Sequence, residues 1–197
     1  MKNIISASQL KKEDIEKILK QASVFEKECK KNKVKKLLKD KIVACMFFEP
    51  STRTRLSFET AALKLGAQVI SAENAMANSS SYKGESIEDT ARMLSCYADI
   101  IVIRHPKAFT LEAVVKVASV PVINAGDGAN EHPTQALLDL YTIRKEHGRL
   151  TNLKIGFGGD LLNSRTLKSL VPFLRFYEGN KFYFISPKEL ALSREFI

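Results

Sequence analysis

The densest run of side chains that could do chemistry is Ser51-Thr52-Arg53-Thr54-Arg55, directly after the apolar run Ile42–Phe48. If the apolar run is a strand and a helix follows, unpaired backbone N–H groups and the positive end of the helix dipole meet at this turn. An anion binds well there, because hydroxyls add hydrogen bonds and Arg can grip phosphate oxygens with two N–H groups. The run therefore predicts a phosphate site. The alternative is that Ser51 or Thr52 only caps the helix while both arginines pair with carboxylates.

Other polar side chains follow the remaining apolar runs. Arg104 follows one run, His132 and Gln135 lie in GDGANEHPTQ after the next, and Arg165 lies in GDLLNSRT after a third. The carboxyl ends of parallel strands meet at one edge of a sheet, so these cationic and polar groups are expected to gather there. A neutral His132 at that edge can donate a hydrogen bond to a carbonyl oxygen, although a capping or surface role is the alternative.

A long polar stretch runs from about residue 72 to Glu85 and ends in NSSSYKG. Loops of this length inside a compact domain are usually functional or mobile. Lys83 and the serines Ser79–Ser81 can reach an anion from it, and a solvated loop is the alternative.

Several other chemistries have no matching motif. No His, Cys or acidic cluster has the spacing of a metal site, and no GxSxG elbow is present. In KIGFGGD the dinucleotide pattern GxGxxG fails because residue 161 is Leu. Without a protein nucleophile, metal or cofactor loop, the anion and carbonyl ligands favour direct transfer between two bound substrates, catalysed by orientation and charge stabilisation.

Strand and helix patterns alternate along the chain after a first, Lys-rich helix. Amphipathic helix patterns separate apolar runs, which predicts a doubly wound parallel sheet with flanking helices. We expect residues 1–150 to form a complete α/β domain, and residues 151–197 to be only the beginning of a second one. The predicted strands are Ile42–Phe48, Gln68–Ser71, Asp99–Arg104, Val120–Ala125, Leu153–Gly158 and Lys181–Ser186.

The net charge of +9 looks at first like a nucleic-acid signal. Residues 1–41 hold 13 Lys and 6 acidic residues without a single Arg, whereas the rest of the chain carries only +2. Because apolar residues recur at helical spacing among these lysines and no aromatic residues interleave with them, a solvated helix face is the better interpretation.

No apolar run approaches the length of a membrane span, and three widely spaced cysteines favour a reducing cytoplasm over a disulfide scaffold.

Several segments together resemble the aspartate carbamoyltransferase family: FFEPSTRTRLSFETAALKLGA, IRHP, NAGDGANEHPTQALLDLYTI, GGDLLNSRTLKSL and KFYFISPKELALSREFI. The resemblance runs over essentially the whole chain. It implies transfer of a carbamoyl group from carbamoyl phosphate to the amine of L-aspartate, early in pyrimidine synthesis, without a cofactor or a covalent enzyme intermediate. It also implies a homotrimer with shared active sites, and it allows a regulatory chain as a further partner without requiring one.

The resemblance also assigns roles by position. The phosphate would be held by Ser51, Thr52, Arg53 and Thr54 together with Arg104. Thr54, Arg104 and His132 would polarise the carbamoyl carbonyl, and Gln135 would hold the carbamoyl NH₂. Ser79 and Lys83 match a loop that reaches the neighbouring subunit's site, where Lys83 would contact aspartate, and Arg165 would bind an aspartate carboxylate.

Three alternatives stay open at this point. Ornithine carbamoyltransferase shares STRTR but usually has Cys where this chain has Thr134. A truncated, non-catalytic chain that only binds carbamoyl phosphate is the second. A nucleotide-binding domain is the third, and it would be stabilised by NAD or ATP instead.

Overall fold

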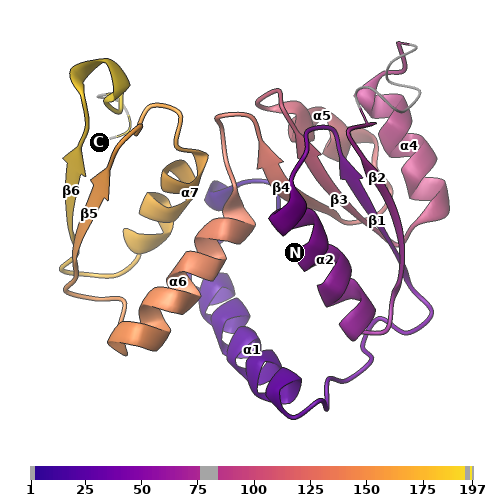
Figure 1. Ribbon diagram of the computed structural model, residues 1–197, viewed down its shortest axis with the longest axis horizontal. Coiled ribbons are helices and arrows are strands. Elements are labelled where there is room, and N and C mark those ends of the chain that lie inside the picture. Colours follow the sequence, from indigo (N-terminus) through magenta and orange to yellow (C-terminus); the bar gives the residue numbers. More distant parts are fainter. Residues whose placement is uncertain (1–2, 76–83, 194–195, 197) are drawn as a thin grey trace.

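Strands and helices alternate along the computed structural model, which describes residues 3–75, 84–193 and 196 (Figure 1). The strands are β1 (Ile42–Phe47), β2 (Gln68–Glu73), β3 (Ile100–His105), β4 (Val122–Asp127), β5 (Lys154–Gly158) and β6 (Lys181–Ile185). The α-helices are α1 (Lys12–Lys30), α2 (Thr52–Lys64), α4 (Ile87–Tyr97), α5 (Thr110–Val117), α6 (Pro133–His147) and α7 (Arg165–Leu174). Short 3₁₀ helices occur at η1 (Ala7–Gln9) and η3 (Lys188–Leu190).

The first four strands form one parallel sheet in the order β2-β1-β3-β4. In the central strand β1, Val43 lies opposite Val69 of β2 on one side and Ile100 of β3 on the other. The chain winds from β1 out to β2, and then from β3 out to β4 in the other direction. The strand order therefore reverses between β1 and β3, which confirms the predicted doubly wound sheet and creates a crevice at their carboxyl ends.

Both faces of this sheet are covered, which explains why its inner strands are apolar without alternation. Successive side chains of a strand point to opposite faces. Ala44 and Met46 of β1 pack in one core cluster with residues of α4 and α5, whereas Val43, Cys45 and Phe47 pack in another with Ala62 of α2.

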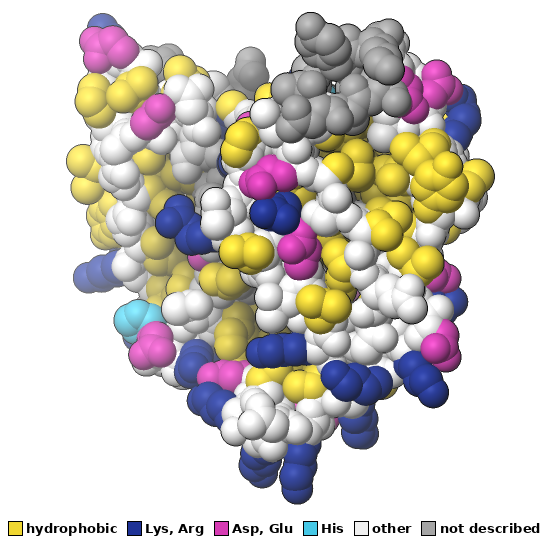
Figure 2. Space-filling view, turned by 45° about the vertical axis from the view of Figure 1, so that its right-hand side comes forward, with side chains coloured by type: hydrophobic (Ala, Val, Ile, Leu, Met, Phe, Trp, Pro, Cys, Tyr) yellow, Lys and Arg dark blue, Asp and Glu magenta, His cyan; other side chains and the backbone are white. Residues whose placement is uncertain are grey.

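The N-terminal segment joins the outer strand to the helices. Ile4 forms a parallel bridge with Ile123 of β4, and η1 and α1 then pack beside α6 and α7. The buried residues Ile15 and Leu19 form the inner face of α1, while its lysines are mostly exposed. Figure 2 shows basic side chains spread over the lower end of the molecule, where α1 ends and the chain turns back toward β1. The predicted solvated lysine face is confirmed.

The strands β5 and β6 pair in a separate, two-stranded parallel sheet. Leu140 of α6 and Phe173 of α7 belong to the same buried cluster, so this second sheet and its helix are packed onto the first part of the chain. The division at residue 150 stays a prediction.

The structure differs from the sequence-based prediction at one helix and at the ends of several strands, of which β2 continues two residues past Ser71 to Glu73. The helix α5 was not predicted, and it begins after Phe109, whose backbone is left-handed (φ 62°) and whose side chain makes no capping hydrogen bond. The strand predicted over Val120–Ala125 begins at Val122 and continues to Asp127, because Asp127 still pairs with His105 after an irregularity in the register. Gly126 and Asp127, which the sequence analysis places after the strand, therefore belong to β4.

Two leucines of α6 test how much this helix contributes to the core. Leu140 is fully buried, whereas Leu138 is 57% exposed on the opposite side of the helix. We expect Leu140→Ala to lower the free energy of unfolding by about 2–5 kcal/mol through lost burial and the cavity left behind. Leu138→Ala should change it by less than about 0.5 kcal/mol. Urea unfolding followed by circular dichroism measures both, and equal effects would contradict the assigned core.

Candidate functional site

A cleft of about 1070 Å³ opens at the carboxyl ends of β1 and β3, where the strand order reverses. Its walls come from the turn after β1, the start of α2, the end of β3, the start of α6 and the start of α7. The cleft is lined by Pro50, Ser51, Thr52, Arg53, Thr54, Ser57, Phe58, Ala61, Arg104, His132, Thr134, Gln135, Leu138, Arg165 and Thr166. The structure thus brings together every predicted site residue that it describes. Their roles in binding stay predictions.

The turn before α2 presents its polar groups to this cleft. Ser51 occupies the N-cap position, but its side chain makes no capping hydrogen bond, so its hydroxyl is not used by the helix. Arg53 is exposed, and its side chain has no ion pair or hydrogen bond with any residue that the structure describes. Backbone N–H groups at the first turn of a helix lack intrahelical partners and attract anions. The turn has the properties of an anion site.

Arg55 differs from Arg53 in this respect. Its guanidinium pairs with Glu59 at 3.1 Å and with Glu73 at 3.0 Å, and it ties the start of α2 to the end of β2. The alternative to a phosphate site was that both arginines of this run pair with carboxylates. Among the described residues, this is right for Arg55 and wrong for Arg53.

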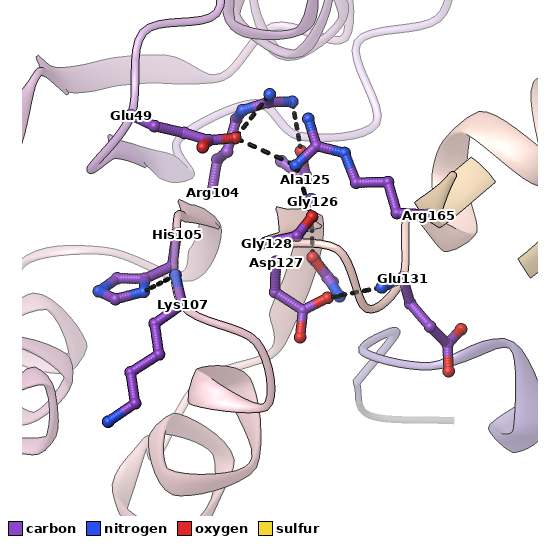
Figure 3. A network of polar contacts seen from close by, with 11 residues as sticks. Glu49, Arg104, His105, Lys107, Ala125, Gly126, Asp127, Gly128, Glu131 and Arg165 are labelled. Carbon is purple, nitrogen blue, oxygen red and sulfur yellow. Dashed lines mark hydrogen bonds and ion pairs between the residues drawn. The ribbon is translucent and has the colours of Figure 1, made fainter. Parts of the chain in front are cut away.

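Glu49 is a site residue that the sequence analysis missed. Its Oε1 atom lies 2.6 Å from Nη2 of Arg104 and 3.1 Å from Nη1 of Arg165, so one carboxylate oxygen joins both guanidinium groups (Figure 3). Arg165 also donates to the carbonyl oxygen of Gly128 at 3.1 Å. The available signal was an acidic residue at the end of an apolar strand, directly before the predicted phosphate turn.

Arg104 is the most buried cation of the cleft, with 8% of its surface exposed. Burial lowers the pKa of its guanidinium, nearby Arg165 lowers it further, and Glu49 acts in the opposite direction. Its Nε atom is buried without a hydrogen-bond partner among the described residues. Arg still keeps its charge in such surroundings, so Arg104 places a fixed positive charge inside the cleft.

Gly126 makes room for this pair of cations. A Cβ atom at residue 126 would lie 3.2 Å from Nη1 of Arg104 and 3.3 Å from Cζ of Arg165. The backbone there has φ +114°, which residues with a side chain rarely adopt. Gly at residue 126 therefore suits both the backbone angle and the close approach of the two guanidinium groups to the end of β4.

His132 stands at the N-cap of α6 and is buried. Its backbone N–H donates to Ser169 Oγ of α7 at 2.9 Å, which fixes the start of the helix. Burial lowers the pKa of the imidazole to about 4, with smaller contributions from Arg165 and Arg104. The ring is neutral near pH 7, and a neutral imidazole keeps one N–H to donate.

Gln135 lies in the first turn of α6 and lines the cleft. Its Nε2 atom donates to Asp139 Oδ1 at 2.9 Å.

Ser79 and Lys83 lie outside the described residues. Among the residues that are described, no group of three His, Cys, Asp or Glu side chains could hold a metal ion, and no helix is long and apolar enough to cross a membrane.

Comparison with known proteins gives the family. Residues 2–145 match the family model described as the carbamoyl-phosphate-binding domain of aspartate/ornithine carbamoyltransferases. The chain belongs to this family.

Curated relatives extend the similarity over the whole chain. It is 50% identical to the aspartate carbamoyltransferase catalytic subunits of Methanocaldococcus jannaschii and Archaeoglobus fulgidus, and in both cases all of this chain is aligned. It covers only 64% and 65% of those two proteins, respectively, so it spans less than two thirds of their length.

Solved structures of this family have the same fold. The catalytic subunit of M. jannaschii aspartate transcarbamoylase matches with a TM-score of 0.92 at 50% identity, covering 100% of this chain and 64% of that one. Aspartate transcarbamoylase from Trypanosoma cruzi, in complex with carbamoyl phosphate, matches with a TM-score of 0.94 at 38% identity, covering 100% of this chain and 60% of that one.

The state of His132 can be tested by NMR titration. Because its pKa is about 4 in the folded chain and near 6.5 in an unfolded one, the ring should stay neutral down to about pH 5. Between these values the unfolded chain binds the proton first, so His132 should make the fold less stable as the pH falls from about 6.5 toward 4. The Cε1 proton signal that disappears in His132→Gln identifies the ring. A midpoint near 6.5 for that signal would contradict the assigned burial.

Proposed function

We propose that this chain carries the carbamoyl-phosphate site of an aspartate carbamoyltransferase. The observation that carries the proposal is the cleft itself, in which Arg53, Arg104, His132 and Gln135 converge from three different elements beside the hydroxyls of the phosphate turn. Cations and N–H donors of this kind fit a phosphate next to a polar carbonyl group. The names of the curated relatives support the same activity.

In the proposed reaction the amine nitrogen of aspartate attacks the carbonyl carbon of carbamoyl phosphate. A C–N bond forms and the carbonyl oxygen gains negative charge. The bond from carbon to the phosphate oxygen then breaks, and the phosphate leaves and takes up the proton that the amine loses. The enzyme needs no nucleophile of its own for this step. Its contribution is to orient two substrates and to stabilise the charge that develops.

The proposed roles follow from where the side chains lie. Ser51, Thr52, Arg53 and Thr54 would bind the phosphate at the positive end of α2, with Arg104 beside them. Arg104, Thr54 and His132 would stabilise the oxyanion. For His132 the neutral ring is an advantage, because an N–H can be donated without a third positive charge beside Arg104 and Arg165.

Gln135 would accept a hydrogen bond from the carbamoyl NH₂, and Arg165 would bind an aspartate carboxylate. Support for the role of Arg165 comes from its position at the start of α7, from which it lines the same cleft as the phosphate turn. Glu49 would hold Arg165 and Arg104 in place.

Aspartate is favoured over ornithine as the acceptor. Thr134 stands where ornithine enzymes usually have Cys, and the relatives named above are aspartate enzymes. The cluster of cations in the cleft also fits an acceptor with two carboxylates better than one with a second amine.

The assembly and the location are further parts of this proposal. A homotrimer with shared active sites, in which Ser79 and Lys83 reach the neighbouring site, is inferred from the family resemblance. Large apolar residues are left exposed on α2, β2 and α4, which supports contacts with other subunits: Leu56, Leu63, Ile70 and Tyr97. We place the enzyme in the cytoplasm, in pyrimidine synthesis.

The phosphate role of Arg53 is tested by substitution. Arg53→Ala should weaken carbamoyl phosphate binding about 10- to 100-fold, because a charge-assisted hydrogen bond is lost, while the free energy of unfolding changes little. At the same concentration, carbamoyl phosphate should raise the melting temperature of the variant much less than that of the unsubstituted chain. The matched control is Arg92→Ala, which removes an exposed Arg of α4 whose one ion pair with a described residue is to Asp89. Equal shifts in Arg53→Ala and Arg92→Ala would refute the role.

The acceptor is tested by a carbamoylation assay with each amino acid. We expect N-carbamoyl-aspartate and no citrulline, measured by chromatography of the products. Transfer to ornithine and none to aspartate would overturn the assignment. Tight binding of carbamoyl phosphate with no transfer to either acid would instead support the non-catalytic alternative, and protection by NAD or ATP alone would support a nucleotide site.

A further inference from the structure

Asp139 is an acidic residue on α6 whose position calls for an explanation. It is partly buried, and no Lys, Arg or His pairs with it within the described part of the chain. Among the described residues, its hydrogen-bond donor is Nε2 of Gln135, one helical turn earlier, at 2.9 Å. Burial raises the pKa of its carboxyl, and the bond from Gln135 lowers it. A carboxylate taken partly out of water without a cation costs folding free energy, so packing alone does not account for it.

The carboxylate determines how the amide of Gln135 is turned. An ionised carboxylate only accepts hydrogen bonds, whereas an amide has a donor end and an acceptor end. The NH₂ end of Gln135 must therefore face Asp139, and the carbonyl oxygen is kept as a free acceptor. Gln135 itself lines the cleft, beside His132 and Thr134.

We infer that Asp139 is a positioning residue that presents the carbonyl oxygen of Gln135 to the NH₂ of a carbamoyl group. It would thereby make the site prefer carbamoyl phosphate to acyl phosphates that have no N–H donor, such as acetyl phosphate. The inference rests on the proposed function, and it adds the residue that gives the amide its direction. If residue 139 could also donate a hydrogen bond, the amide of Gln135 could turn its NH₂ toward the substrate. The NH₂ of Gln135 and the NH₂ of the carbamoyl group, both donors, would then face each other.

The test compares two ligands that differ only in this group, since acetyl phosphate carries CH₃ where carbamoyl phosphate carries NH₂. Isothermal titration calorimetry gives Kd for both, and their ratio measures the preference independently of the overall charge. In Asp139→Asn the ratio should fall about twofold, because either orientation of an amide pair is then allowed. In Asp139→Lys, which can only donate, it should fall about tenfold or more, because the free end of the amide is now NH₂.

Two controls separate positioning from charge and from folding. Glu146→Lys makes the same change of charge at an exposed residue of the same helix and should leave the ratio unchanged. In a Gln135→Met background the substitutions at Asp139 should no longer change the ratio, because the amide is gone. Circular dichroism establishes that each variant is folded, and the isosteric Asn variant decides the question if the Lys variant is not.

The outcomes are distinguishable from failure of the proposed function. An unchanged ratio in folded Asp139→Asn and Asp139→Lys, or an equal fall in the Gln135→Met background, overturns the positioning role. Equal affinity of the unsubstituted chain for carbamoyl and acetyl phosphate overturns it too, while leaving a phosphate site. A chain that binds neither of these ligands, nor inorganic phosphate, overturns the proposed function itself.

Discussion

Two guanidinium groups that lie partly out of water repel each other, and in this protein one carboxylate oxygen holds them together. Glu49 joins Arg104 and Arg165 at 2.6 and 3.1 Å, respectively. Without this anion, two positive charges in a region of low dielectric would raise the free energy of the fold. The arrangement also needs residue 126 to be Gly, because a Cβ would press on both guanidinium groups. The charge of the cleft therefore depends on a carboxylate and a glycine that do no chemistry in the proposed reaction.

The topology explains why these groups can meet at all. Glu49 follows β1 and Arg104 lies near the end of β3, and these strands are neighbours because the strand order reverses between them. His132 and Gln135 enter from α6 after β4, and Arg165 enters from α7, which packs beside α6. Residues more than a hundred positions apart thus share one cleft: the parallel sheet places Glu49 and Arg104, and the packing of α7 beside α6 brings Arg165 to them. Fold and site are two consequences of the same winding.

The sequence predicts what depends on local patterns. The predicted strands follow from runs of neighbouring apolar residues, and the structure has each of them with small differences in bounds. Prediction from the sequence fails where the local pattern is weak or where a residue's partner lies far away along the chain. The helix α5 is only 8 residues long and begins after Phe109, which provides no side-chain cap, so no start signal marks it. Glu49 and Asp139 are ordinary acidic residues in the sequence. Glu49 matters because the fold brings Arg104 and Arg165 to it. Asp139 matters, in our inference, because it determines which end of the Gln135 amide faces the cleft.

The same cations also determine what His132 can do. Its pKa is lowered to about 4 first by burial and then by Arg165 and Arg104, so protonation would place a third positive charge among them. The cleft thus divides two tasks between two kinds of side chain: fixed cations attract the phosphate, and a neutral ring offers an N–H to the carbonyl oxygen. Had the imidazole been exposed, it would titrate near neutral pH and the strength of that hydrogen bond would change with pH. Burial beside the arginines removes this dependence, because it moves the pKa of the imidazole to about 4, below the physiological pH range.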